Sequence, residues 1–169
     1  MNERKTAFAA VVDANTRLLI LGSLPGDASL AANEYYANPR NRFWHLVGDV
    51  IDRPDLPELE YEQRLAALLT RGIGLRDAVA SATRDGSLDS AIRAVEAAGL
   101  ATLVSALPRL QAVAFNGKTS ARIARPQMDG RALTLIDLPS SSPAHAAMPF
   151  TKKRQVWLDL RRFLTSPAP

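Results

Sequence analysis

The 169-residue sequence contains no cysteine and only two histidines, His45 and His145. The missing cysteines exclude disulfides, a thiol nucleophile and thiolate-ligated zinc or iron–sulfur sites. Two histidines far apart in the sequence do not make a histidine-rich metal site. We therefore expect an activity that needs no metal and no other cofactor.

Long apolar runs are missing as well. No stretch reaches the roughly 18 apolar residues of a membrane span, and the start of the chain lacks the apolar segment of a signal peptide. We expect a cytoplasmic protein that does not contact a membrane. The net charge of +4 permits an anionic partner such as a nucleic acid but does not identify one.

The length and the composition, with 47% hydrophobic and 22% charged residues, are those of one globular domain. No internal repeat or low-complexity linker divides the chain. We therefore treat residues 1–169 as a single domain and expect it to be a monomer. Residues 165–169 are expected to form a frayed tail.

Apolar residues recur with the periods of strands and helices in alternation. Strands are predicted at residues 17–21, 112–115 and 132–138. Helices are predicted at residues 41–51, 61–71, 100–107 and 151–164, with another that Ser87 would cap and that would carry Leu88, Ile92 and Val95. This alternation predicts an α/β domain with a short, central, mainly parallel sheet and helices on both faces.

Each predicted strand ends in a segment with unusual chemistry. A turn rich in glycine and proline at residues 22–26 follows the first strand, Asn116-Gly117-Lys118 follows the second, and residues 139–143 follow the third. Ligands of parallel sheets bind beyond the carboxyl ends of the strands. We therefore place the candidate active site where these three segments meet.

Residues 35–44 hold four of the ten aromatic side chains, together with several amides. Tyr36 could stack on a base rotated out of a DNA helix, and neighbouring amides could read its edge. Phe43 and Trp44 are better explained as core residues at a helix start. Asn41 has two interpretations, because it could hold a water or cap that helix, and the residues alone favour the cap.

The serines at 140–142 lie between prolines and offer hydroxyls and backbone amides for phosphate contacts. Lys152 and Lys153, in the first turn of the last predicted helix, are further candidates for phosphate contact. We expect His145 to contact DNA rather than to act as an acid or base. The alternative is an ordinary polar surface loop.

Four motifs, in this order, resemble the uracil-DNA glycosylase superfamily. They are Gly22-x-x-Pro25-Gly26, Pro39-x-Asn41-x-Phe43-Trp44, Phe115-Asn116-Gly117-Lys118 and Pro139-Ser140. The resemblance runs from about residue 18 to about residue 163 and is greatest for the hypoxanthine-DNA glycosylase branch. It implies a monofunctional enzyme of base excision repair that hydrolyses the bond between a deaminated base and deoxyribose in single- or double-stranded DNA.

The resemblance also implies roles for individual residues. Leu24 and Leu138 stand where other members carry polar groups, one of which positions the attacking water. In the hypoxanthine branch, the positioning of the water is attributed to an asparagine at a different place in the sequence. Asn41 is the position of this chain that matches it. The residues implied to contact the base are Gly22, Ser23, Leu24, Tyr36 and Asn116, and Asn116 could instead brace the pocket. The residues implied to contact DNA are Ser140, Ser141, Ser142, Pro143, His145, Lys152 and Lys153.

Other functions stay open. The apolar Leu24 and Leu138 would suit a protein of this fold that binds damaged DNA without cleaving it, although Tyr36, Asn41 and Asn116 argue against that. A uracil-specific mismatch glycosylase is a second alternative. A nucleotide- or phosphate-binding α/β protein unrelated to DNA is a third, and the ordered set of motifs argues against it.

Overall fold

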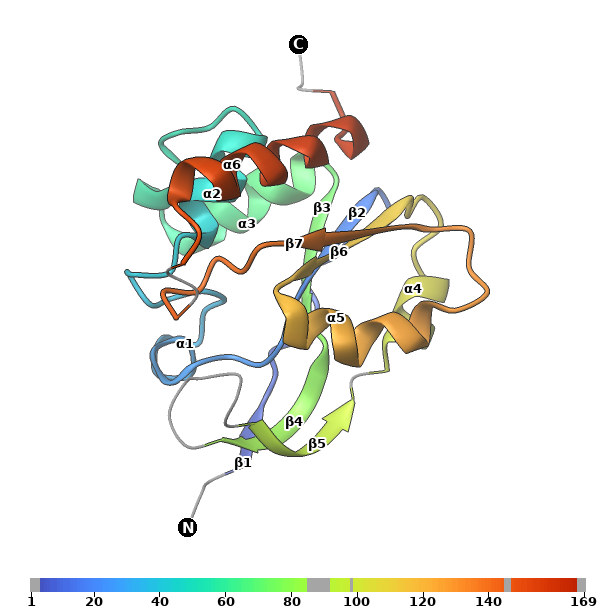
Figure 1. Cartoon of the computed structure of the whole chain (residues 1–169). Helices are drawn as coiled ribbons and strands as arrows, with labels where there is room; N and C mark the ends of the chain where they lie inside the picture. The colour runs from blue at the N-terminus through green and yellow to red at the C-terminus, as the bar shows by residue number, and fades with distance from the viewer. Residues whose placement is uncertain (1–3, 85–91, 98, 145–146, 167–169) are drawn as a thin grey trace.

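The computed structural model describes residues 4–84, 92–97, 99–144 and 147–166 (Figure 1). At its centre lies a four-stranded parallel sheet in the order β3-β2-β6-β7. Its strands are β2 (Leu18–Gly22), β3 (Ile73–Asp77), β6 (Ala112–Asn116) and β7 (Thr134–Leu138). The expected α/β fold with a mainly parallel central sheet is confirmed.

The strand predicted at residues 17–21 corresponds to β2, and the other two predicted strands correspond to β6 and β7. Sequence analysis missed β3, because Gly72 and Gly74 interrupt its apolar pattern. The structure explains Gly74: a Cβ there would lie 2.8 Å from Val12 Cγ1 and 2.9 Å from the Val11 carbonyl oxygen. A glycine inside a strand marks such a close approach of another segment.

The central strand β2 divides the core into two layers. Successive side chains of a strand point to opposite faces, so Leu18 and Ile20 pack in one hydrophobic cluster and Leu19 and Leu21 in the other. All four side chains are fully buried. The unbroken apolar run in the sequence is therefore the mark of a strand that is covered on both faces.

Helices cover both faces of this sheet (Figure 1). The first cluster is completed by α2 (Phe43–Val50), α3 (Tyr61–Thr70), η1 (Leu56–Glu58), α6 (Phe150–Leu158) and η4 (Asp159–Phe163). The second is completed by α4 (Leu100–Ser105), α5 (Lys118–Ala124) and η3 (Arg125–Met128). The helix predicted at residues 151–164 is thus split into α6 and a 3-10 turn.

A second, antiparallel sheet was not expected. It contains β1 (Arg4–Thr6), β4 (Val79–Arg84) and β5 (Ile92–Ala97) in the order β1-β4-β5. The predicted helix carrying Ile92 and Val95 is therefore wrong, because pairing with β4 overrides a spacing that also fits a helix. Ser87 and Leu88, the expected start of that helix, lie outside the described residues.

The chain is held in place up to Thr165. Its N–H donates to the Arg71 carbonyl (2.9 Å), and its own carbonyl accepts from Arg71 Nε (2.8 Å). Thr165 is therefore not frayed as expected, and residues 167–169 lie outside the described part of the chain. Among the helices that the structure describes, none is long and apolar enough to cross a membrane.

Candidate active site

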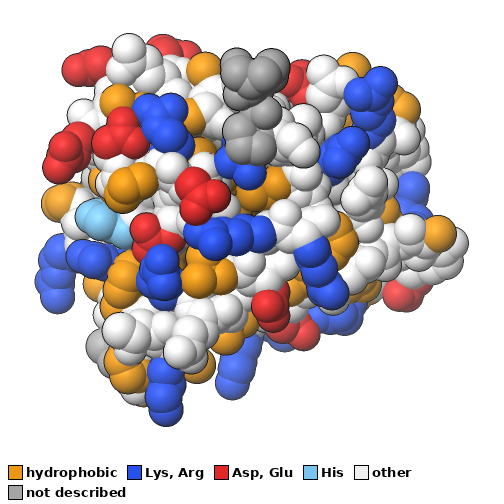
Figure 2. Space-filling model, turned by 90° about the horizontal axis from the view of Figure 1, so that it is seen from above, with side chains coloured by type: hydrophobic (Ala, Val, Ile, Leu, Met, Phe, Trp, Pro, Cys, Tyr) orange, Lys and Arg blue, Asp and Glu red, His pale blue; other side chains and the backbone are white. Residues whose placement is uncertain are grey.

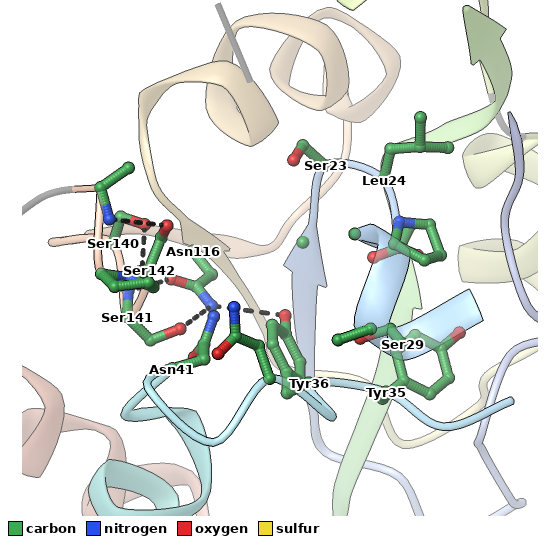
Figure 3. A pocket seen from close by; sticks show the side chains of 18 of the residues that line it. Ser23, Leu24, Ser29, Tyr35, Tyr36, Asn41, Asn116, Ser140, Ser141 and Ser142 are labelled. Atoms are coloured by element: carbon green, nitrogen blue, oxygen red, sulfur yellow. Dashed lines mark hydrogen bonds between the residues drawn. The ribbon is translucent and has the colours of Figure 1, made fainter. Parts of the chain in front are cut away.

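A cleft of about 360 Å³ opens beyond the carboxyl ends of β2, β3 and β6. It is lined by the turn at residues 22–26, by α1 (Asp27–Ala32), by residues 35–41, which we call the tyrosine segment, and by residues 140–144, which we call the serine loop (Figure 3). The predicted residues that the structure brings together here are Gly22, Ser23, Leu24, Tyr36, Asn41, Asn116, Ser140, Ser141, Ser142 and Pro143.

Asn116, at the end of β6, joins the serine loop to the tyrosine segment (Figure 3). Its Nδ2 donates to Ser141 Oγ (2.9 Å) and to Tyr36 Oη (3.3 Å), while its Oδ1 accepts from the Ser141 N–H (2.9 Å). The side chain is 7% exposed. Because both ends of the amide bond to the protein, this geometry favours bracing of the pocket over direct contact with a base.

The rest of the serine loop is anchored just as firmly. The Ser141 carbonyl accepts from the Arg42 N–H (3.0 Å), and the Pro139 carbonyl accepts from Trp157 Nε1 (3.0 Å). Ser141 is 1% exposed. In this structure Ser141 is a buried support for the loop, and its expected approach to the DNA minor groove stays a prediction. Ser140, Ser142 and Pro143 are half-buried and remain at the rim.

Tyr36 has a left-handed backbone conformation (φ 55°), which is uncommon for a residue other than glycine. Its ring stacks on Phe43 with the centroids 3.8 Å apart and the planes 16° from parallel. Its carbonyl accepts from Trp44 Nε1 (3.2 Å). These contacts hold the ring as a wall of the cleft, with Phe43 behind it.

Asn41 lines the cleft and also contacts the start of α2. Its Oδ1 accepts at 3.0 Å from the N–H of Phe43, the first residue of α2, while Arg42 between them holds the N-cap position itself. A carbonyl oxygen has two lone pairs, so this bond leaves room for a second donor such as a water. Both interpretations of Asn41 are therefore compatible with its position.

Gly22 is essential to the shape of the cleft. A Cβ at this position would lie 2.7 Å from Asp77 Oδ1 and 2.7 Å from Tyr36 Oη. The missing side chain thus lets two polar groups approach the end of β2. The turn that follows is fixed, because the Gly22 and Ser23 carbonyls accept from the Ala78 and Val79 amides (2.7 and 3.1 Å).

Asp77 is the site residue that sequence analysis missed. It ends β3, pairs in register with Gly22, is 4% exposed and lines the cleft. Burial, followed by the charge of Asp77, raises the pKa of the neighbouring Tyr35 hydroxyl. The sequence does contain a signal for Asp77, which is the acidic residue at the end of the short apolar run after Gly72. This signal points to the cleft only once the run is recognised as the strand β3.

Two apolar side chains occupy the positions where the sequence suggested missing polar groups. Leu24 is 6% exposed, packs on Val79 and lines the cleft. Leu138 is 4% exposed and belongs to the larger hydrophobic cluster. Neither can orient a water, so the polar side chains available for chemistry in the described cleft come from other positions, among them Asn41 and Asp77.

The two lysines of the last helix differ in their surroundings. Lys152 is exposed, whereas Lys153 is only 5% exposed, and burial lowers the pKa of its ammonium group. Lys153 is therefore not presented to solvent in this structure, and its expected DNA contact stays a prediction. His145 lies outside the described residues.

The face above the sheet carries mixed charge (Figure 2). Lys and Arg side chains are interspersed there with Asp and Glu. Two ion pairs, Arg154–Asp49 (2.9 Å) and Arg161–Asp52 (2.7 Å), link the closing helical segment to α2 and the residues after it. This face therefore has no uniform positive field for a polyanion. In the described residues no group of three His, Cys, Asp or Glu side chains could hold a metal ion.

Comparison with known proteins identifies the family. The model of the uracil DNA glycosylase superfamily matches residues 9–161. The chain belongs to the uracil DNA glycosylase superfamily. Each of the four motifs contributes at least one residue to the lining of the cleft, namely residues 22–26, Asn41, Asn116 and Ser140.

Individual relatives within the superfamily have named activities. A hypoxanthine DNA glycosylase of Methanosarcina acetivorans is 40% identical over 151 residues, which make up 89% of this chain and 93% of the relative. A hypoxanthine DNA glycosylase of Methanosarcina barkeri is 43% identical over 117 residues, 69% of this chain and 73% of the relative. A solution NMR structure from M. acetivorans, described as a candidate uracil DNA glycosylase, has a TM-score of 0.84 and 37% identity, with 95% of this chain and 98% of that chain covered.

Proposed function

We propose that this chain is a monofunctional DNA glycosylase of base excision repair that removes hypoxanthine from DNA and leaves an abasic site. Membership of the superfamily supports the reaction class. Two relatives named hypoxanthine DNA glycosylases support the base. The substrate is a DNA strand carrying the lesion, which is rotated into the cleft for the reaction.

The observation that carries the choice of base is the buried Asp77 carboxylate in the cleft. An ionised carboxylate only accepts hydrogen bonds. Hypoxanthine presents an N–H at N1, where adenine presents a lone pair. Asp77 can therefore accept from the N1–H of hypoxanthine, a bond that the N1 lone pair of adenine cannot make. Guanine, uracil and xanthine also carry ring N–H groups, so this contact separates hypoxanthine from adenine only.

The remaining groups have roles that follow from their positions. Tyr36 stacks on the flipped base, because Phe43 supports its ring from behind. Cleavage builds positive charge on the sugar and negative charge on the departing base, so a positioned water is needed more than a strong base. Asn41 holds this water through the second lone pair of Oδ1. No lysine nucleophile takes part in this scheme.

One observation favours a different function. Leu24 and Leu138 are apolar, which suits a protein that binds damaged DNA without cleaving it. The two functions are separated by incubating the protein with duplexes that contain inosine, xanthine, uracil or adenine at one position, followed by alkali. We expect strand breaks at inosine and none at adenine. Binding to the inosine duplex without breaks would establish the alternative.

The Asp77→Asn variant tests the choice of base, because it keeps the shape of the side chain and adds an N–H donor. Loss of one charge-assisted hydrogen bond, worth about 1.5–3 kcal/mol, should slow single-turnover excision of hypoxanthine about 10- to 100-fold. Asp159→Asn is the control, since Asp159 is exposed and begins η4 outside the cleft. Equal rates for Asp77→Asn and the unmodified protein would contradict the proposed contact.

A further inference from the structure

A second hollow lies directly beside the cleft, between β7 and the helical segment formed by α5 and η3. Its volume is about 630 Å³. Gly117 lines this groove, and a Cβ on Gly117 would lie 3.2 Å from the Cβ of Ser140, which lines the cleft. The groove, which we call the α5 groove, therefore adjoins the cleft, and the contact between Gly117 and Ser140 at the base of the serine loop lies between the two hollows.

Positive charge dominates the part of the α5 groove nearest to the cleft. Lys118 and Arg122 line it, and both are exposed. Within the described part of the chain, neither side chain forms an ion pair or a hydrogen bond with another residue. Their charges are therefore available to an external anion.

The third cation of the groove is already paired. Arg125 bonds to Asp137 and its guanidinium lies 4.8 Å above the centre of the Phe115 ring. Asp137 is thereby neutralised, and Asp129 remains as an exposed acid in the groove. Lys118 and Arg122 thus carry the positive charge that the groove does not balance internally near the cleft.

We propose that the DNA strand next to the flipped nucleotide runs along the α5 groove, with Lys118 and Arg122 each binding one phosphate. The two residues are one helical turn apart, which places their Cβ atoms about 5–6 Å apart and suits two neighbouring phosphates of one strand. The groove adjoins the first residue of the serine loop, Ser140, so a strand whose nucleotide enters the cleft passes beside the groove. The inference rests on the proposed function only in requiring that the chain binds DNA.

The test is the salt dependence of binding to an undamaged duplex. Each phosphate contact contributes about 0.9 to the slope of log K against log salt concentration. The Lys118→Ala/Arg122→Ala double variant should therefore lower the magnitude of this slope by about 2. Both side chains are exposed, so the melting temperature should not change. The Lys118→Arg/Arg122→Lys variant keeps both charges and should keep the slope.

The matched control is Arg109→Ala/Arg131→Ala. Arg109 and Arg131 precede β6 and β7, so they lie near the amino ends of the strands, at the opposite edge of the sheet from the cleft. This variant loses the same charge, and it should keep the slope of the unmodified protein. If both double variants lower the slope equally, or neither does, the α5 groove is not a DNA site.

Excision of hypoxanthine by the unmodified protein is measured separately. It tests the proposed function, whereas the comparison of slopes tests the groove. A protein that binds DNA through Lys118 and Arg122 but does not excise the base would retain the inference and lose the proposed function. Normal excision by the unmodified protein, together with an unchanged slope in the Lys118→Ala/Arg122→Ala variant, would support the proposed function and contradict the groove.

Discussion

At the scale of single residues, Asn41 is the position where a structural and a catalytic role can be separated. Its Oδ1 bonds to the Phe43 N–H, so Asn41→Ala should lower stability by about 1 kcal/mol, and Asn41→Ser should restore most of that loss. If Asn41 holds the attacking water, both variants should bind inosine DNA normally and excise the base far more slowly. Melting temperature, DNA affinity and single-turnover rate are measured on each. Near-normal excision by Asn41→Ser would show that Asn41 has only the structural role at the start of α2.

Gly22 is predicted to tolerate no side chain. In Gly22→Ala the new methyl group would meet Asp77 Oδ1 and Tyr36 Oη at 2.7 Å, and such overpacking typically costs about 1–3 kcal/mol. We expect a lower melting temperature and loss of excision together. Gly99→Ala is the control, because no atom lies within 4 Å of its added Cβ. It should change stability by less than about 1 kcal/mol and leave excision intact.

Lys153 offers a prediction about pH. Burial lowers the pKa of its ammonium group in the folded state, so the unfolded chain binds more protons between that pKa and the ordinary value of about 10.4. The contribution of Lys153 to stability therefore rises as pH rises through this window. Lys153→Met should be more stable than the unmodified protein at neutral pH, with a gain that shrinks as pH approaches 10. The exposed Lys152→Met should show no such gain in urea unfolding across this range.

The site residues also show what the sequence alone can provide at this scale. Motifs placed Gly22, Tyr36, Asn41 and Asn116 around the cleft, but the partners of each side chain depend on packing. Asn116 was expected to contact the base or to brace the pocket, and its hydrogen bonds to Ser141 and Tyr36, which favour bracing, are visible only in three dimensions. Asp77 was missed because a single acid after a short apolar run carries no motif of its own.

At the scale of elements, α6 positions the serine loop through Trp157. Its Nε1 donates to the Pro139 carbonyl, and its ring packs edge-on against Phe43. Trp157→Phe should lower stability by about 1–3 kcal/mol because the Pro139 carbonyl loses its donor. It should also weaken binding of inosine DNA. Leu160→Val, in the same cluster, should cost about 1 kcal/mol without weakening DNA binding. Equal effects of both variants on DNA affinity would show that the bond to Pro139 does not position the loop.

Element type was predictable where the pattern was long or unbroken, as in β2 and in the helix at residues 43–50. It was not predictable for β5, where Ile92 and Val95 fit the spacing of a helix. These residues form a strand because they pair with β4, and the spacing of apolar residues within the segment itself does not reveal that pairing. Strands depend more than helices on neighbours that lie elsewhere in the chain.

At the scale of the whole molecule, β2 is shared by both layers and by the cleft. Leu18 and Ile20 belong to one cluster, Leu19 and Leu21 to the other, and Gly22 reaches the cleft. Substitutions at successive positions of this strand therefore disturb alternate layers, so the strand as a whole is constrained by both. The edge strands β3 and β7 have a neighbour on only one side within the central sheet.

This arrangement has a consequence for how the sequence can vary over time. Compensating pairs of substitutions should accumulate readily among the helices of either layer, while the inner strands β2 and β6 should change least, because their successive side chains are fully buried in the two layers by turns. A library of all single substitutions, scored by protein abundance in cells, would measure this. We expect the apolar positions of β2 to tolerate fewer replacements than the half-buried Leu135 and Ile136 of β7. Sequence variation in this fold would then be concentrated in the edge strands of the central sheet.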